Sequence, residues 1–188
     1  MVMRLFVGVP IPQAMAQALG EICQTWARKL RSRVAWVQPA LMHVTLKFLG
    51  EVPQAQVPAT QRALEALTAP AFSLAPQGAG FFPSAARPRV FWLGFGKGAP
   101  ELGNLAQGLE AALEPLGFAP ETRPFTGHVT LARIKDAAPG DPWMQAAQAV
   151  AALQLPVFAV DRMVLWQSIL GPQGPRYQPV REYLLSRG

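Results

Sequence analysis

The tetrapeptide His-Val-Thr-Leu occurs twice in this chain of 188 residues, at 43–46 and again 85 residues later at 128–131. The two copies contain both histidines of the sequence, each at the same position of the motif. Such a repeat, in two segments with the same strand-like pattern, is typical of a chain built from two similar lobes. The sequence therefore predicts two related lobes in which equivalent strands present equivalent side chains.

Each copy of the motif lies in an apolar run with the alternation of a β-strand. Successive side chains of a strand point to opposite faces, so each motif sets an imidazole beside a hydroxyl while the valine and the leucine face the core. The first strand is expected over 41–49 and is expected to end at Gly50. Its alternation places His43, Thr45 and Lys47 on one face, opposite an apolar face formed by Val44, Leu46 and Phe48.

The rest of the chain alternates between helical and extended patterns. Apolar residues recur every three to four positions over 13–30, 102–116 and 143–153, and 59–67 is rich in helix formers, so these are the expected helices. Further strands are expected over 1–9, 34–37, 72–82, 89–95, 125–134, 157–169 and 177–185, with a Gly-Pro turn at 171–175. The predicted fold is α+β, with two mostly antiparallel sheets and helices on the outer faces.

Composition and charge narrow the class of protein. Hydrophobic residues make up 51% of the chain and charged residues 15%, as in an ordered globular protein. The net charge of +6 attracts phosphate esters, although an arginine-rich composition without functional meaning explains it as well. The longest uncharged run includes Pro156 and three glutamines, which do not suit a membrane-spanning helix. Because Cys23 is the only cysteine, a reducing, cytoplasmic setting is expected.

Two histidines that face one cleft suit a displacement at phosphorus. Because the unperturbed pKa of histidine lies near neutrality, one neutral ring can act as a base while one charged ring acts as an acid. The hydroxyls of Thr45 and Thr130 are then placed to hold the non-bridging phosphate oxygens. The spacing of histidine, cysteine and carboxylate residues offers no metal cage, so neither a metal nor another cofactor is expected. A single copy of the motif is ordinary for a half-buried strand, and it is the repetition that favours chemistry.

Several segments, in order along the chain, resemble one known family. They are 4–7, 41–51, 82–84 ahead of 87–92, and 128–133. Together they resemble the two-histidine (2H) phosphoesterases, and within them the bacterial and archaeal RNA 2′,3′-cyclic phosphodiesterases first described as 2′-5′ RNA ligases. The resemblance covers almost the whole chain, and it implies a single domain over 1–188 whose two intertwined lobes are related by a pseudo-twofold axis. A central cleft between the lobes would carry the two motifs.

The resemblance also implies an activity and roles for five residues. The activity is hydrolysis of RNA 2′,3′-cyclic phosphate ends to 2′-phosphomonoesters, with His43 as the proton donor and His128 as the proton acceptor. Thr45 and Thr130 would bind the phosphate. Arg133 is a further candidate phosphate ligand, since a guanidinium suits an oxyanion. In a regular strand Arg133 would point away from the face of His128, so this role requires a β-bulge.

Three other interpretations stay open at this point. The same histidines would promote the reverse reaction, 2′-5′ ligation of tRNA halves. The chain could bind RNA ends without turnover, or act on cyclic mononucleotides. The expected ligand is RNA with a 2′,3′-cyclic phosphate end or a related nucleotide, and a monomer is expected because no heptad or edge-pairing signal stands out. Candidates for stacking on a base, each also suited to core packing, are Trp36, Phe48, Trp92, Trp166 and Tyr177.

Overall fold

The computed structural model describes residues 1–172 and 174–186. Its helices are α1 (Gln13–Ala27), α2 (Val57–Ala66), α3 (Ala99–Leu113) and α4 (Trp143–Ala151), with short 3-10 turns η1 (Pro39–Leu41), η2 (Gln54–Gln56) and η3 (Glu114–Leu116). Its strands are β1 (Val2–Pro10), β2 (Arg33–Trp36), β3 (His43–Pro53), β4 (Phe72–Leu74), β5 (Pro76–Ser84), β6 (Arg87–Phe95), β7 (His128–Asp136), β8 (Phe158–Val160), β9 (Arg162–Gly171) and β10 (Gly174–Leu184). The α+β class is confirmed. The predicted turn at 171–175 joins β9 to β10, and its Gln173 lies outside the described residues.

Two antiparallel sheets are present, and the larger one runs through both lobes. Its strand order is β10-β9-β1-β3-β7-β6-β5, with β2 also paired to β7, whereas β4 and β8 form the small second sheet. The two halves of the large sheet meet at one ladder position, where Val44 lies opposite Val129. These valines are equivalent residues of the two motifs. An antiparallel pair of equivalent residues has a local twofold axis between its two members, so the twofold axis expected from the repeat passes between the two motifs.

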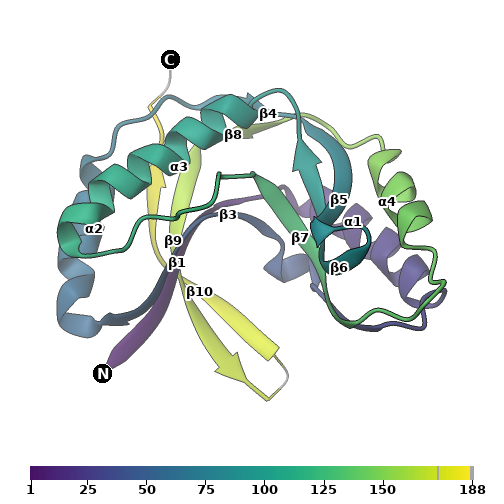
Figure 1. The fold of residues 1–188 in the computed structure, drawn as a ribbon. Helices are drawn as coiled ribbons and strands as arrows, with labels where there is room; N and C mark the ends of the chain where they lie inside the picture. Colours follow the sequence, from purple (N-terminus) through teal and green to yellow (C-terminus); the bar gives the residue numbers. More distant parts are fainter. Residues whose placement is uncertain (173, 187–188) are drawn as a thin grey trace.

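The helices cover the two halves of the sheet separately. Figure 1 shows α2 and α3 together over one half, and α1 and α4 together at the other. Each helix turns an apolar side inward, as its three-to-four spacing predicts: α1 buries Met15, Leu19, Cys23 and Trp26, for example. The unbroken apolar run near the N-terminus has a similar cause, because β1 lies between β3 and β9 and is buried from 5 through 9. No helix in the described part of the chain is long and apolar enough to cross a membrane.

Both motif strands contain a bulge directly after the threonine. Gly8 pairs with Thr45 and Val7 with Lys47, so Leu46 is an extra residue on β3. On β7, the equivalent Leu131 is extra, because successive residues of β6 pair with Thr130 and with Ala132. A bulge reverses the alternation of the residues that follow it. The two strands therefore share both their motif and the irregularity that follows it.

The bulge in β3 overturns part of the predicted alternation. Lys47 is only 6% exposed and lies with the core, whereas Phe48 is 64% exposed and lies on the face of His43. The prediction that Lys47 shares the histidine face and Phe48 the core is therefore wrong. The predicted end of the strand at Gly50 is also wrong, because Gly50 adopts a φ of +73° and β3 continues to Pro53. A positive φ is accessible to glycine at little cost, which lets the strand bend without ending.

Candidate active site

His43 and His128 are held by the same backbone contact. Each begins its strand, and its Nδ1 lies 2.7 Å from the carbonyl oxygen two residues earlier, that of Leu41 or Thr126. Because a carbonyl only accepts hydrogen bonds, Nδ1 donates the proton in both rings. The Nε2 atom of each neutral ring is then left as the basic atom that can exchange a proton with a ligand. The two histidines are thus oriented alike for acid-base chemistry.

The antiparallel pairing of Val44 with Val129 places the histidine of each motif near the threonine of the other motif. In an antiparallel pair, the residues on either side of this position bring Thr45 toward His128 and Thr130 toward His43. Thr45 also contacts its own histidine, with Oγ1 3.0 Å from Nε2 of His43. All four side chains are partly buried. The structure therefore brings together the two histidines and two threonines that the sequence singled out.

The environment favours the neutral form of both rings. Burial lowers the pKa of His43 below 6.5, the carbonyl of Leu41 opposes this, and the positive charges of His128 and Arg133 lower the pKa further. Burial also lowers the pKa of His128, with the Thr126 carbonyl opposing and Arg133 adding to the effect. A bound phosphate would supply the negative charge that stabilises an imidazolium. Protonation of one ring is therefore expected to accompany anion binding.

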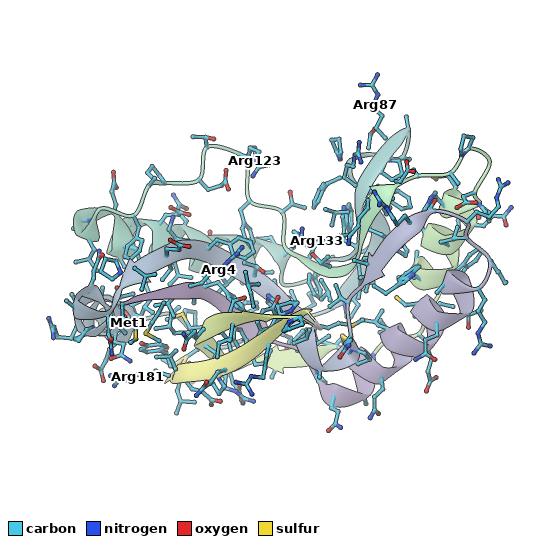
Figure 2. All side chains as sticks on the ribbon, turned by 90° about the horizontal axis from the view of Figure 1, so that it is seen from below. Met1, Arg4, Arg87, Arg123, Arg133 and Arg181 are labelled. Atoms are coloured by element: carbon cyan, nitrogen blue, oxygen red, sulfur yellow. The ribbon has the colours of Figure 1, made fainter. Side chains whose placement is uncertain are left out.

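Arg133 lies on the histidine side because of the bulge in β7. Its charge adds to the lowering of the pKa of His43 and His128 by burial, and it opposes the rise that burial causes in the pKa of Tyr177, so the guanidinium lies near all three. Arg133 is exposed, unlike the buried Ala132 before it. Figure 2 shows Arg133 between the segment that carries Arg123 and the β5–β6 hairpin that carries Arg87. The bulge that a phosphate-binding role requires is therefore present.

Aromatic rings surround both histidines. The centroid of the His43 ring lies 4.9 Å from the ring centroid of Phe6, 5.3 Å from that of Tyr177 and 5.5 Å from that of Trp166. Phe6 was not among the site residues predicted from sequence, where it counts as part of an apolar strand. The one signal that could have found it is its place in the family-like segment 4–7. The rings limit the freedom of His43 and exclude water from one side of it.

The aromatic candidates for base stacking separate into different environments. Tyr177 and Trp166 lie beside His43, and Trp92 lies 6.4 Å from His128. Phe82, in the segment 82–84 but not a candidate, is closer to His128 at 5.0 Å. Phe48 is exposed near Phe6. By contrast, Trp36 packs in the core against Phe91 and Trp143, so it is removed from the site.

A groove of about 490 Å³ adjoins His43. It is formed by the end of β1, the first turns of α1, the turn η1 and two aromatic residues from the β9–β10 hairpin, Trp166 and Tyr177. The amides of Gln13 and Gln17 lie at its border. His128 does not line this groove, so the surroundings of the two histidines differ although their strands are alike.

Lys47 anchors the segment that leads into His128. Its buried ammonium group donates to a carboxylate oxygen of Glu110, on α3, and to the carbonyl of Ala119 at 2.9 Å. Ala119 lies in the loop that follows η3 and continues through Thr126 to His128. Glu110 also accepts from the backbone of Glu121 in this loop. Lys47 is thus a structural cation rather than a ligand of the cleft.

Metal-binding groups are not gathered near the histidines. Within residues 1–172 and 174–186, no three His, Cys, Asp or Glu side chains lie close enough together to hold a metal ion. The side-chain cation whose charge acts on both histidines is Arg133. The arrangement of two basic nitrogens, two hydroxyls and one guanidinium can move protons and hold an oxyanion.

Comparison with known proteins identifies the family. The chain matches the family described as LigT-like phosphoesterase over residues 9–92 and 96–177. Relatives named RNA 2′,3′-cyclic phosphodiesterase include a protein of Archaeoglobus fulgidus, 33% identical over 184 residues, with 96% of this chain and 99% of the relative covered. Another, from Thermus thermophilus, is 36% identical over 195 residues and covers 97% of this chain and 90% of the relative. The chain therefore belongs to the LigT-like phosphoesterase family.

Solved structures agree with this assignment. A crystal structure of a protein from Thermus thermophilus has a TM-score of 0.80 with 33% sequence identity, and the match covers 97% of this chain and 98% of that one. The structure of Escherichia coli LigT complexed with 3′-AMP has a TM-score of 0.77 with 26% identity and full coverage of both chains. The fold of these structures is thus shared over almost the whole length of the protein.

Proposed function

We propose that this protein is an enzyme that hydrolyses RNA 2′,3′-cyclic phosphate ends to 2′-phosphomonoesters by metal-independent acid-base catalysis. The observation that carries the proposal is the pair of equivalent histidines on either side of Val44 and Val129, each with Nδ1 bound to a backbone carbonyl. Such a pair can supply a base and an acid to one reacting group. Relatives of similar length named RNA 2′,3′-cyclic phosphodiesterase support the class of substrate.

The proposed reaction is one in-line displacement at phosphorus. Nε2 of neutral His128 takes a proton from water as the water oxygen bonds to phosphorus, and the bond from phosphorus to O3′ breaks. Nε2 of protonated His43 gives its proton to the departing O3′, which leaves the phosphate on O2′. Thr45, Thr130 and Arg133 hold the non-bridging oxygens, where negative charge is stabilised. After product release, His128 gives its proton to solvent and His43 takes one up, which restores the starting state.

A direct test uses a short RNA that ends in a 2′,3′-cyclic phosphate, incubated with the purified protein in excess EDTA. Wild type should form the 2′-phosphate, and His43→Ala and His128→Ala should each lose about 10²-fold or more in kcat. Met144→Ala is a suitable control, because this exposed residue of α4 lies outside the site. Activity that survives both histidine substitutions, or that is abolished by EDTA alone, would refute the mechanism.

The same preparation separates hydrolysis from two of the three other interpretations, ligation and RNA-end binding. Ligation requires a second RNA with a free 5′-hydroxyl, and without an energy input water should outcompete it. Accumulation of a 2′-5′ joined product over the 2′-phosphate would therefore favour the ligase interpretation. Tight binding of the RNA by wild type without any product would favour an RNA-end binding protein.

We also propose that the protein works as a monomer in the cytoplasm. One chain contributes both histidines, so a complete site needs no second copy. Burial raises the pKa of Cys23 to about 12, which leaves an unreactive thiol suited to a reducing compartment. Size-exclusion chromatography with light scattering should give a mass near 20.3 kDa. A stable dimer at micromolar concentration would contradict the monomer.

A further inference from the structure

We infer that the groove beside His43 binds the nucleobase of the terminal nucleotide, the one that carries the cyclic phosphate. The inference rests on the proposed function and on the geometry of in-line displacement. In such a reaction the attacking water and the leaving O3′ lie on opposite sides of phosphorus. O3′ belongs to the ribose of the terminal nucleotide. The ribose therefore lies on the side of the proton donor, His43, and the water on the side of His128.

The groove lies where this geometry requires it. His43 is part of its wall, whereas His128 is not. Its volume of about 490 Å³ falls in the range of roughly 300–1,000 Å³ that is common for small-molecule sites. A nucleoside attached to a phosphate between the two histidines could therefore extend into the groove without leaving His43.

The lining of the groove suits a flat, uncharged group. Apart from His43 and Tyr177, none of the residues that line it is ionisable, and none is a lysine or arginine. Trp166 and Tyr177 contribute aromatic rings to its wall, and stacking on one such ring contributes about 1–3 kcal/mol per base. The cation close to both histidines, Arg133, is not among the lining residues. The phosphate and the base thus have separate places, one cationic and one neutral.

Gln13 and Gln17 add hydrogen-bonding groups at the edge of the groove. They are four residues apart on α1, so both amides lie on the same side of the helix, and both are exposed. An amide has both donors and an acceptor, and its orientation can adapt to the edge of any base. We therefore expect the enzyme to require a base at the terminal nucleotide but to discriminate little among the four bases.

The test fills the groove without touching His43. Ala40 is an exposed residue of η1 that lines the groove, so Ala40→Trp should occupy part of its volume. Ala14→Trp is the matched control, because Ala14 is exposed on α1 but does not line the groove. Each protein is assayed on two RNAs that end in a 2′,3′-cyclic phosphate and differ only in whether the terminal ribose carries uracil or no base.

Wild type and Ala14→Trp should have a kcat/KM at least about tenfold higher for the RNA with the base, as expected from one stacked base. In Ala40→Trp this preference should fall to within about twofold, while the rate on the abasic RNA stays close to that of wild type. Hydrolysis of both RNAs at equal rates by wild type would overturn the inference and leave the proposed function intact. An equal loss on both RNAs in Ala40→Trp would also overturn it, because that pattern indicates a displaced His43.

A binding measurement separates failure of the groove from failure of the reaction. Calorimetry with adenosine 2′-monophosphate and with inorganic phosphate should show tighter binding of the nucleotide by about tenfold or more in wild type and in Ala14→Trp. Ala40→Trp should lose this difference. If no RNA is hydrolysed but this pattern holds, the groove assignment stands and the proposed reaction fails. If neither hydrolysis nor a difference in binding is found, both are refuted.

Discussion

Asp141 should be a main determinant of stability, because it ties the loop after α1 to the loop before α4. Its carboxylate accepts hydrogen bonds from the backbone of Arg31 at 2.9 Å, from the backbone of Ser32 at 2.8 Å and from the hydroxyl of Ser32 at 2.6 Å. The same hydroxyl accepts from the backbone of Ala138 and from the indole of Trp143. The Asp141 side chain is 1% exposed. The ionised carboxylate of Asp141 is thus stabilised by hydrogen bonds from Arg31 and Ser32.

The magnitude follows from the pKa of Asp141. Burial raises the pKa, but the hydrogen bonds from Ser32 and Arg31 outweigh it and lower the value from 3.8 to about 2. A depressed pKa means that the stabilisation is fully present above 3.8 and is lost as the pH falls toward 2. The full shift corresponds to about 2.4 kcal/mol. Because the neighbouring Arg31 side chain is 72% exposed, water screens part of this interaction, and we expect about 1–2 kcal/mol.

The measurement is urea unfolding of wild type and Asp141→Asn at pH 7 and at pH 3. The variant should be less stable by about 1–2 kcal/mol at pH 7 and by about half as much at pH 3, where the carboxyl is largely protonated in the unfolded chain but still mostly ionised in the folded protein. Asp161→Asn is the control, since that side chain is 60% exposed, and it should change stability by less than about 0.5 kcal/mol. A stability difference that is the same at both pH values would refute the assignment to ionisation.

Four further predictions concern the site and its support. Arg133→Gln should lower kcat/KM by about 10- to 100-fold and raise the pKa of both histidines, which would move the pH profile to higher pH. In wild type, kcat/KM should already be falling at pH 6.5 and should go on falling as the pH rises, because the lowered pKa of the donor histidine means that it loses its proton below this pH; a profile that rises above pH 6.5 would contradict the lowered pKa values. Lys47→Met should lower the free energy of unfolding in urea by about 1–3 kcal/mol, since it leaves Glu110 and the Ala119 carbonyl without their donor, and an unchanged midpoint would show that this contact contributes nothing. Phe48→Ala should change stability by less than about 0.5 kcal/mol, whereas a core position would cost about 3–5 kcal/mol in the same assay.

The parts of the fold that depend on local pattern could be predicted from sequence. The helix beginning at Gln13 shows an amphipathic period that packing preserves, and the alternation of the two motif strands predicts their bounds to within a few residues. The close approach of His43 and His128 was also predictable, because a repeated motif implies a repeated position. These features follow from residues that are near one another in the chain.

The features that depend on strand pairing could not be predicted. The bulge at Leu46 depends on how β3 registers against β1, and that at Leu131 on the register of β7 against β6. Alternation within a single strand carries no sign of either. In the same way, the expected strands 72–82 and 157–169 each divide into two, since β4 and β8 leave the large sheet to pair with one another. Only the partner strand decides where such a division falls.

The two bulges explain how a symmetric pair of strands becomes an asymmetric site. Phe48 and Arg133 are equivalent residues, each five positions after its histidine and each returned to the histidine face by the bulge. One is a ring and the other a cation. Phe48 lies on the side of the site where aromatic rings pack around His43 and where the neutral groove is found. Arg133 instead adds a positive charge close to the imidazole rings of His43 and His128. The proposed in-line displacement would use this difference, because O3′ of the nucleoside leaves on one side of phosphorus and water enters on the other. In the proposed reaction the repeated strands supply two equivalent imidazoles, and the residues that differ between the lobes would make one the donor and the other the acceptor.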